Sequence, residues 1–281
     1  SLFAIEHALK AGDKKKGLEL IELNVDYLMD TSQYSTILKF ASLFNKPDLL
    51  STKKFGVIYA WTITIAGRAE LAEEYLGELE KGIINESKNQ DNKKQLAIVY
   101  LIFNLINTYK GESEDAFKYS QLALKYVDDE DLVWKSFAYY LNSNTLILRF
   151  ELENSIDSLL VAWSCAKQLN NFYLKIVNPS QIAFLLKLKG QYSEALKICN
   201  ELLKEFDSKN TGEEFKLNLF SAVIYSTKGS ILTEQGKTEE GLQLALEGYS
   251  LSQKLIGISF KGYGTLILAE TYFKIRKFEK A

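Results

Sequence analysis

The chain has 281 residues, 47% hydrophobic and 25% charged, with a formal net charge of −2. This composition excludes a disordered chain, and the charge lacks the basic excess of a nucleic-acid-binding domain, so we expect no direct nucleic-acid contact by this segment. The chain has two prolines, whereas average usage of about 5% gives about 14, and this scarcity favours helix because proline interrupts helix interiors.

In chain order, one motif recurs: an apolar helix ends in a turn, often at glycine, and a small residue follows five positions later. After a first step of 55 residues, successive turns are 39 to 46 residues apart, and the long first step predicts an extra element near Pro47. The turns and their small residues are Gly12 and Gly17, Gly67 and Ala72, Gly111 and Ala116, Phe150 and Ser155, Gly190 and Ala195, Gly236 and Gly241, and Arg276 and Ala281.

The small residue has a physical cause, since two antiparallel helices joined by a short turn cross close to that turn. A counterpart on the first helix is expected twelve positions upstream, and this column reads Ala60, Asn104, Ser143, Ala183, Gly229 and Ala269, in which Asn104 fits least well. The second helices, such as 114–127 and 193–206, have amphipathic stripes, whereas the first helices, such as 96–106, are apolar nearly all round. Asn178-Pro179 either begins a helix or kinks a longer one.

These observations predict an all-α fold: a right-handed superhelix, or α-solenoid, of antiparallel helix pairs, tetratricopeptide-like with repeats of about 40 residues. The alternative is a compact bundle of unrelated helices, which the regular period disfavours. Cys165 and Cys199 have no CxxC spacing, which argues against a zinc site and a disulfide framework and fits a reducing, cytoplasmic compartment. No apolar stretch is long enough to span a membrane, and no signal peptide opens the chain.

The turn-plus-alanine spacing, with Tyr100, Tyr139 and Tyr225 near the starts of first helices, resembles the tetratricopeptide repeat. The segments 4–22 (AIEHALKAGDKKKGLELIE) and 59–80 (YAWTITIAGRAELAEEYLGELE) are similar to MalT-like, large ATP-dependent regulators of the LuxR class.

The resemblance implies a superhelical sensor that receives an inducer, which is maltotriose in the maltose-system member. It lies between a P-loop ATPase and a helix-turn-helix DNA-binding domain. The chain contains no GxxxxGK[ST] motif and no defensible helix-turn-helix, so we interpret it as a fragment. Residues 1–50 are then a helical linking segment and residues 51–281 the tetratricopeptide-like sensor domain. ATP is implied for the full-length family member only.

First helices usually line the concave side of such stacks, so counting back 15, 11 and 8 positions from each small residue gives a candidate ligand-binding stripe. Its earlier part, Val57, Trp61, Thr64, Leu101, Leu105 and Thr108, is mostly apolar, and we expect Trp61 to be core. The candidate ligand-binding residues are Tyr140, Asn144, Ser180, Phe184, Lys187, Ser226, Ser230, Thr233, Glu270 and Phe273, with Ile147 and Leu266 in the same count. Rings mixed with hydroxyl, amide and charged groups suit a sugar-like ligand or an extended peptide. Alternatively, the Ser and Thr side chains only fill tight helix contacts.

The chain has one histidine and no phosphate loop, HExxH or GxSxG motif, so we expect no catalysis and no cofactor or metal in this segment. The favoured function is ligand or partner sensing within a multidomain bacterial transcriptional activator, with an inducer on the concave face. The expected partners are a small-molecule inducer or regulatory protein and the other domains of the regulator, with no membrane contact. The alternative is a tetratricopeptide-type protein–protein interaction scaffold without a small-molecule ligand.

Overall fold

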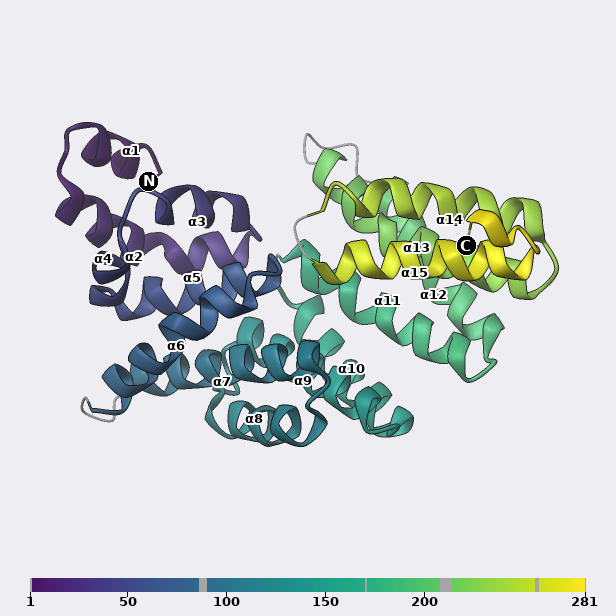
Figure 1. Ribbon diagram of the computed structural model, residues 1–281, viewed down its shortest axis with the longest axis horizontal. Helices are drawn as coiled ribbons and strands as arrows, with labels where there is room; N and C mark the ends of the chain where they lie inside the picture. The colour runs from purple at the N-terminus through teal and green to yellow at the C-terminus, as the bar shows by residue number, and fades with distance from the viewer. Residues whose placement is uncertain (1, 86–89, 170, 208–213, 256–257, 281) are drawn as a thin grey trace. The chain divides into compact units, whose positions relative to one another are not determined.

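The computed structural model describes residues 2–85, 90–169, 171–207, 214–255 and 258–280, and all its regular elements are helices (Figure 1). Within these ranges no strand occurs, which confirms the predicted all-α class. None of the described helices combines the length and the apolar character needed to cross a bilayer. The helices are α1 (Leu2–Lys10), α2 (Lys14–Asp30), α3 (Tyr34–Ala41), α4 (Lys46–Ser51), α5 (Lys53–Ile65), α6 (Ala69–Ile84), α7 (Gln90–Lys110), α8 (Ser113–Tyr126), α9 (Leu132–Leu148), α10 (Leu152–Lys167), α11 (Phe172–Leu188), α12 (Tyr192–Asp207), α13 (Glu214–Glu234), α14 (Thr238–Ser252), α15 (Ile258–Lys274) and the 3-10 helix η1 (Phe278–Lys280).

The chain divides into two compact units, Ser1–Asn171 and Phe172–Ala281. Unit 1 contains α1 to α10, and unit 2 contains α11 to α15 and η1. This division differs from the predicted boundary at residue 50, which separates a linking segment from the repeats. That boundary stays a prediction.

All seven predicted turn positions adopt a left-handed backbone. The values of φ are 84° at Gly67 and 76° at Gly190, and they stay positive at Phe150 (62°) and Arg276 (59°), where no glycine is present. At Gly67 the amide donates to Thr64 O and the next amide donates to Ile63 O, the two bonds of a Schellman motif. The same bonds recur at the other six positions, so one capping device ends the first helix of every predicted pair.

The long first step between turns contains one further left-handed turn, at Ser32 (φ 55°), and two short helices. Ser32 links α2 to α3, and α4 follows with Pro47 in its first turn. Asn45 forms a capping box with Asp48 at the start of α4, because each side chain accepts a hydrogen bond from the other residue's backbone. The extra element expected near Pro47 is therefore confirmed.

The two columns of small residues meet across the hairpins. The Ser143 and Ser155 hydroxyl oxygens lie 2.8 Å apart, and a Cβ on Gly229 would lie 2.7 Å from Gly241 O. Asn104, the poorest fit, is fully buried and donates from its amide to Ala116 O at 2.7 Å. A polar side chain therefore replaces a small one there by bonding to the partner backbone. Ala269 is half-buried, and its partner Ala281 lies outside the described residues.

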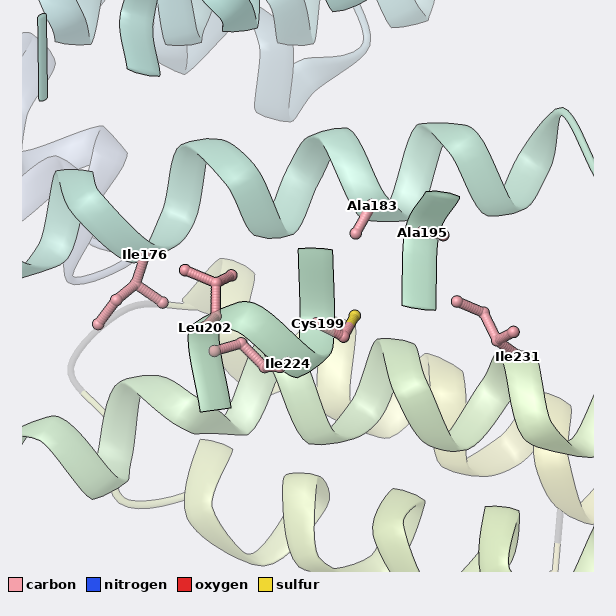
Figure 2. Packing of buried hydrophobic residues seen from close by; sticks show 7 residues of the cluster. All are labelled: Ile176, Ala183, Ala195, Cys199, Leu202, Ile224 and Ile231. Carbon is pink, nitrogen blue, oxygen red and sulfur yellow. The ribbon is translucent and has the colours of Figure 1, made fainter. Parts of the chain in front are cut away.

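Unit 2 has an apolar core between α11, α12 and α13 (Figure 2). Figure 2 shows Ile176 and Ala183 from α11, Cys199 and Leu202 from α12 and Ile224 from α13 around this core, with Ala195 and Ile231 beside them. Burial raises the pKa of the Cys199 thiol to about 12, so this cysteine is a packed hydrophobe. Helix α11 continues through Pro179, so Asn178-Pro179 lies within a longer helix and does not begin one.

In unit 1, residues far apart in sequence join the first helices to the repeats. Glu22 of α2 accepts hydrogen bonds from the Lys54 and Phe55 amides at 3.1 and 3.0 Å, which satisfies two free donors at the start of α5. Asn171 donates to Met29 O at 3.2 Å and accepts from the Ser32 hydroxyl at 3.2 Å. These contacts tie the last residue of unit 1 to the α2–α3 turn.

Candidate functional site

The first helices of three consecutive hairpins, α11, α13 and α15, form the candidate site in unit 2, with α13 packed against the other two. Lys187 of α11 reaches over α13 to Glu270 of α15, with Nζ 3.0 and 2.9 Å from the two carboxylate oxygens. The Lys187 side chain is only 5% exposed, whereas Glu270 is 30% exposed. A lysine this buried is normally paired, because an isolated charge away from water costs several kcal/mol.

Two further helix positions extend this ion pair. Ser230 of α13 donates from its hydroxyl to Glu270 Oε2 at 3.5 Å. Lys274, one turn after Glu270, lies 3.2 Å from Glu270 Oε1 and also pairs with Glu234 of α13. Two cations and two carboxylates therefore alternate across α11, α13 and α15.

Aromatic rings lie beside the charges. The rings of Phe184 and Tyr263 meet edge to face at 5.5 Å, and Lys187 Nζ lies 6.0 Å from the Phe184 ring centre. The Tyr263 hydroxyl lies 2.6 Å from Thr227 Oγ1, and burial raises the pKa of Tyr263, so this phenol stays protonated. We call the set Phe184, Lys187, Ser230, Tyr263, Glu270 and Lys274 the first-helix face.

Other predicted stripe residues of unit 2 face different surroundings. Ser226 and Thr233 face α14, where a Cβ on Gly248 would lie 2.3 Å from Ser226 Oγ and one on Gly241 would lie 2.3 Å from Thr233 Oγ1. These two side chains therefore fill a tight hairpin contact, as the alternative interpretation of the stripe proposed. Ser180 is buried, and its hydroxyl has no hydrogen-bond partner among the described residues.

Two predicted residues of α15 project outward. Phe273 is 63% exposed, and its ring contacts only that of Phe278 among the aromatic pairs of the described residues. Leu266 is 61% exposed. Glu270, the middle residue of the predicted stripe, does lie in the ion pair, but its companions on that face are Tyr263 and Lys274, seven residues before it and four after it, and not Leu266 and Phe273.

The remaining stripe residues belong to unit 1. Tyr140 and Asn144 lie one turn apart on α9, both half-buried, and burial raises the pKa of Tyr140 to about 12. The earlier positions Val57, Trp61, Thr64, Leu101 and Leu105 are buried, whereas Thr108 is half-buried. Trp61 packs edge to face on Trp134 and Phe137, at 5.3 and 4.9 Å, which confirms its core position.

Tyr263, Lys274, Thr227 and Glu234 were not predicted from the sequence. Thr227 and Glu234 are seven residues apart on α13, whereas their partners Tyr263 and Lys274 are eleven apart on α15, so no equal spacing on the two helices marks these contacts. Within the described residues, no group of three or more His, Cys, Asp or Glu side chains is arranged to hold a metal ion.

The fold of the chain is similar to the folds of known solved structures. No protein family matches the sequence, and no curated protein matches it. The chain is similar to the apo form of the quorum sensor NprR from B. thuringiensis, with a TM-score of 0.60 and 19% sequence identity. The match covers 99% of this chain and 70% of that one. At this identity the likeness establishes a shared helical-repeat fold.

Proposed function

We propose that this chain is the signal-sensing domain of a bacterial transcription regulator, and that its ligand binds at the first-helix face of unit 2. The observation that carries the proposal is the Lys187–Glu270 pair, which joins α11 to α15 over α13. Fold similarity to a quorum sensor supports a sensing role. The domain has no catalytic step and no cofactor in this proposal.

The energetics of the pair favour a binding role over a purely stabilising one. Replacing a buried ion pair by apolar residues of similar volume is often neutral or stabilising by about 1–4 kcal/mol, so stability alone gives little reason to keep Lys187 and Glu270 together. A ligand with its own charged or polar groups can instead exchange partners with Lys187, Glu270 and Lys274. Such an exchange changes the contacts between three hairpins, and it gives the ligand different affinities for two arrangements of the repeats.

The chemistry of the face limits the ligand class. Cationic and anionic groups alternate beside the Phe184 and Tyr263 rings, and the Ser230 hydroxyl lies 3.5 Å from a Glu270 carboxylate oxygen. This combination suits a small polar organic signal with an apolar part, including a short extended peptide that has both backbone donors and acceptors.

The regulator assignment rests on the resemblance of segments 4–22 and 59–80 to MalT-like regulators of the LuxR class. In that arrangement the protein is cytoplasmic, ATP binds in another domain and a separate domain contacts DNA. The complete reading frame of the gene tests this part: a P-loop and a helix-turn-helix region support it, and a frame without a DNA-binding domain contradicts it.

Thermal unfolding of the chain against a metabolite panel and a short-peptide library tests the site. A ligand present at 100 times its dissociation constant adds about 2.7 kcal/mol to stability. In the double variant Lys187→Met with Glu270→Gln, both charges are removed together, and Lys274 keeps its pairing with Glu234. We expect the variant to stay folded and to lose the ligand-induced shift.

The exposed pair Lys135–Asp129, 2.6 Å apart, provides the matched control. Lys135→Met with Asp129→Asn removes the same two charge types from unit 1 and should leave the shift intact. If no metabolite or peptide stabilises the folded chain, or if both double variants respond like the unmodified chain, the first-helix face is not the ligand site. A stoichiometric protein partner without any small ligand then favours the scaffold function.

A further inference from the structure

A separate cavity lies in unit 1, where α2 faces the beginnings of α7 and α9. Its volume is about 530 Å³, within the range of roughly 300–1,000 Å³ typical of small-molecule sites. Residues from α2, α7, the end of α8, the α8–α9 connection, the start of α9 and Leu169 line it. We call this hollow the α2–α9 cavity. It shares no residue with the first-helix face.

One part of the cavity wall is apolar and aromatic. Val127 is half-buried in this wall, whereas Trp134 is 2% exposed, packs edge to face against Trp61 and offers almost no ring surface to a ligand. Tyr126 at the end of α8, together with Leu132 and Leu169, extends the same wall. A ligand in this cavity can therefore bury an apolar body against these side chains.

The remaining wall has more negative than positive charge. Five carboxylates line the cavity, from Asp26, Asp30, Asp128, Glu130 and Asp131, and the only lysine or arginine in the lining is Lys94. Lys94 Nζ lies 2.9 Å from Asp131 and 3.6 Å from Asp26, so this lysine joins α2 to the start of α9.

Asp30 has no ion pair or hydrogen bond among the described residues, although it lies at the edge of this polar wall. Partial desolvation raises the pKa of its carboxyl, and the neighbouring Asp26 and Asp131 raise it further. Lys94, already bound to two other carboxylates, opposes this only in part. The cavity therefore has room for a cation next to Asp30.

We propose that the α2–α9 cavity binds a small organic cation, an amine or guanidinium compound whose charged group pairs with Asp30 and whose apolar body lies against Tyr126 and Leu169. The cavity offers accessible apolar and aromatic surface and an unneutralised carboxylate within one open hollow, and these are the two features that such a ligand uses. Because Asp30 ends α2 whereas Tyr126 ends α8, a bound cation adds a further link between the predicted linking segment and the repeats, beside those made by Glu22, Asp26 and Asn171.

Calorimetric titration of the full chain with phenethylamine and with agmatine tests the proposal. Phenethyl alcohol has the same ring and nearly the same shape as phenethylamine without the charge, so it is the matched neutral ligand. We expect both amines to bind saturably and the alcohol to bind at least about tenfold more weakly, which corresponds to about 1.4 kcal/mol.

The variant Asp30→Asn should weaken amine binding by about tenfold and should stay folded, since this exposed carboxyl makes no contact that the change removes. Asp115→Asn, on the exposed side of α8 and outside the cavity, should leave the affinity unchanged. Equal affinities for amine and alcohol, no saturable binding of either amine, or equal effects of the two substitutions would overturn the proposal. The double variant Lys187→Met with Glu270→Gln should bind the amines normally, so this test is independent of the first-helix face.

Discussion

The close crossing of α13 and α14 gives the sharpest test of the hairpin packing. A Cβ on Gly229 would lie 2.7 Å from both Ala245 N and Gly241 O, which are backbone atoms that cannot rotate away. Gly229→Ala therefore forces the two helices apart, and overpacking of this kind costs about 1–3 kcal/mol. Because both contacts are with backbone atoms, we expect a cost in the upper part of this range, about 2–3 kcal/mol. The gain in helix propensity, about 1 kcal/mol, then leaves a net loss of about 1–2 kcal/mol.

Gly77 in the interior of α6 is the matched control, because a Cβ there would meet nothing within 4 Å. Gly77→Ala should stabilise the chain by about 0.5–1 kcal/mol through helix propensity alone. Urea unfolding followed by far-UV circular dichroism measures both free energies. If Gly229→Ala is as stable as the unmodified chain, or if Gly77→Ala is destabilised to the same extent, the crossing is not as tight as described.

Two further predictions concern local backbone and charge. Phe150→Gly should raise the thermal midpoint by relieving a left-handed residue that costs about 1–2 kcal/mol, whereas Gly190→Ala should lower it; opposite signs would contradict the turn assignment. Burial raises the pKa of Glu22 above its usual 4.5, despite the Lys54 and Phe55 amides, so its folded form holds the proton more tightly than the unfolded chain. The contribution of Glu22 to stability is therefore present below pH 4.5 and is lost as the pH rises through the pKa of the folded form. We expect Glu22→Gln to flatten the dependence of the unfolding free energy on pH above pH 4.5. Urea unfolding measures this dependence, and an unchanged profile would refute the argument.

The fold followed from local signals because each hairpin needs the same two things, a left-handed turn and a close crossing. Both features place recognisable residues at fixed spacing in the sequence. The predicted turns have a left-handed backbone even at Phe150 and Arg276, where no glycine is present. The α2–α3 turn was not predicted because it has neither feature: Ser32 is not glycine, and the position five residues later is the large, buried Ile37. The extra helices of this region therefore showed only as a long gap between turns.

The candidate site was less predictable because it depends on which face each first helix turns to its neighbours. Counting from the small residues placed Lys187, Ser230 and Glu270 together, as the structure has them. It could not show that Gly241 and Gly248 bring α14 so close that Ser226 and Thr233 lie against it. The count also put Lys187 and Glu270 in one stripe without predicting that their side chains pair. These residues are 83 positions apart, and no local sequence pattern specifies a side-chain contact at that separation.

The hydrogen bonds between Asn171 and the α2–α3 turn bear on how unit 1 unfolds. In a linear repeat array each hairpin touches only the next, so the ends fray independently of one another. Here Asn171 is hydrogen-bonded to Ser32 and Met29, which are 139 and 142 positions away. Unfolding of α2 and α3 therefore also breaks contacts of the segment that follows α10. Fraying at one end of unit 1 then loosens the other, and hydrogen exchange should report the two ends opening together.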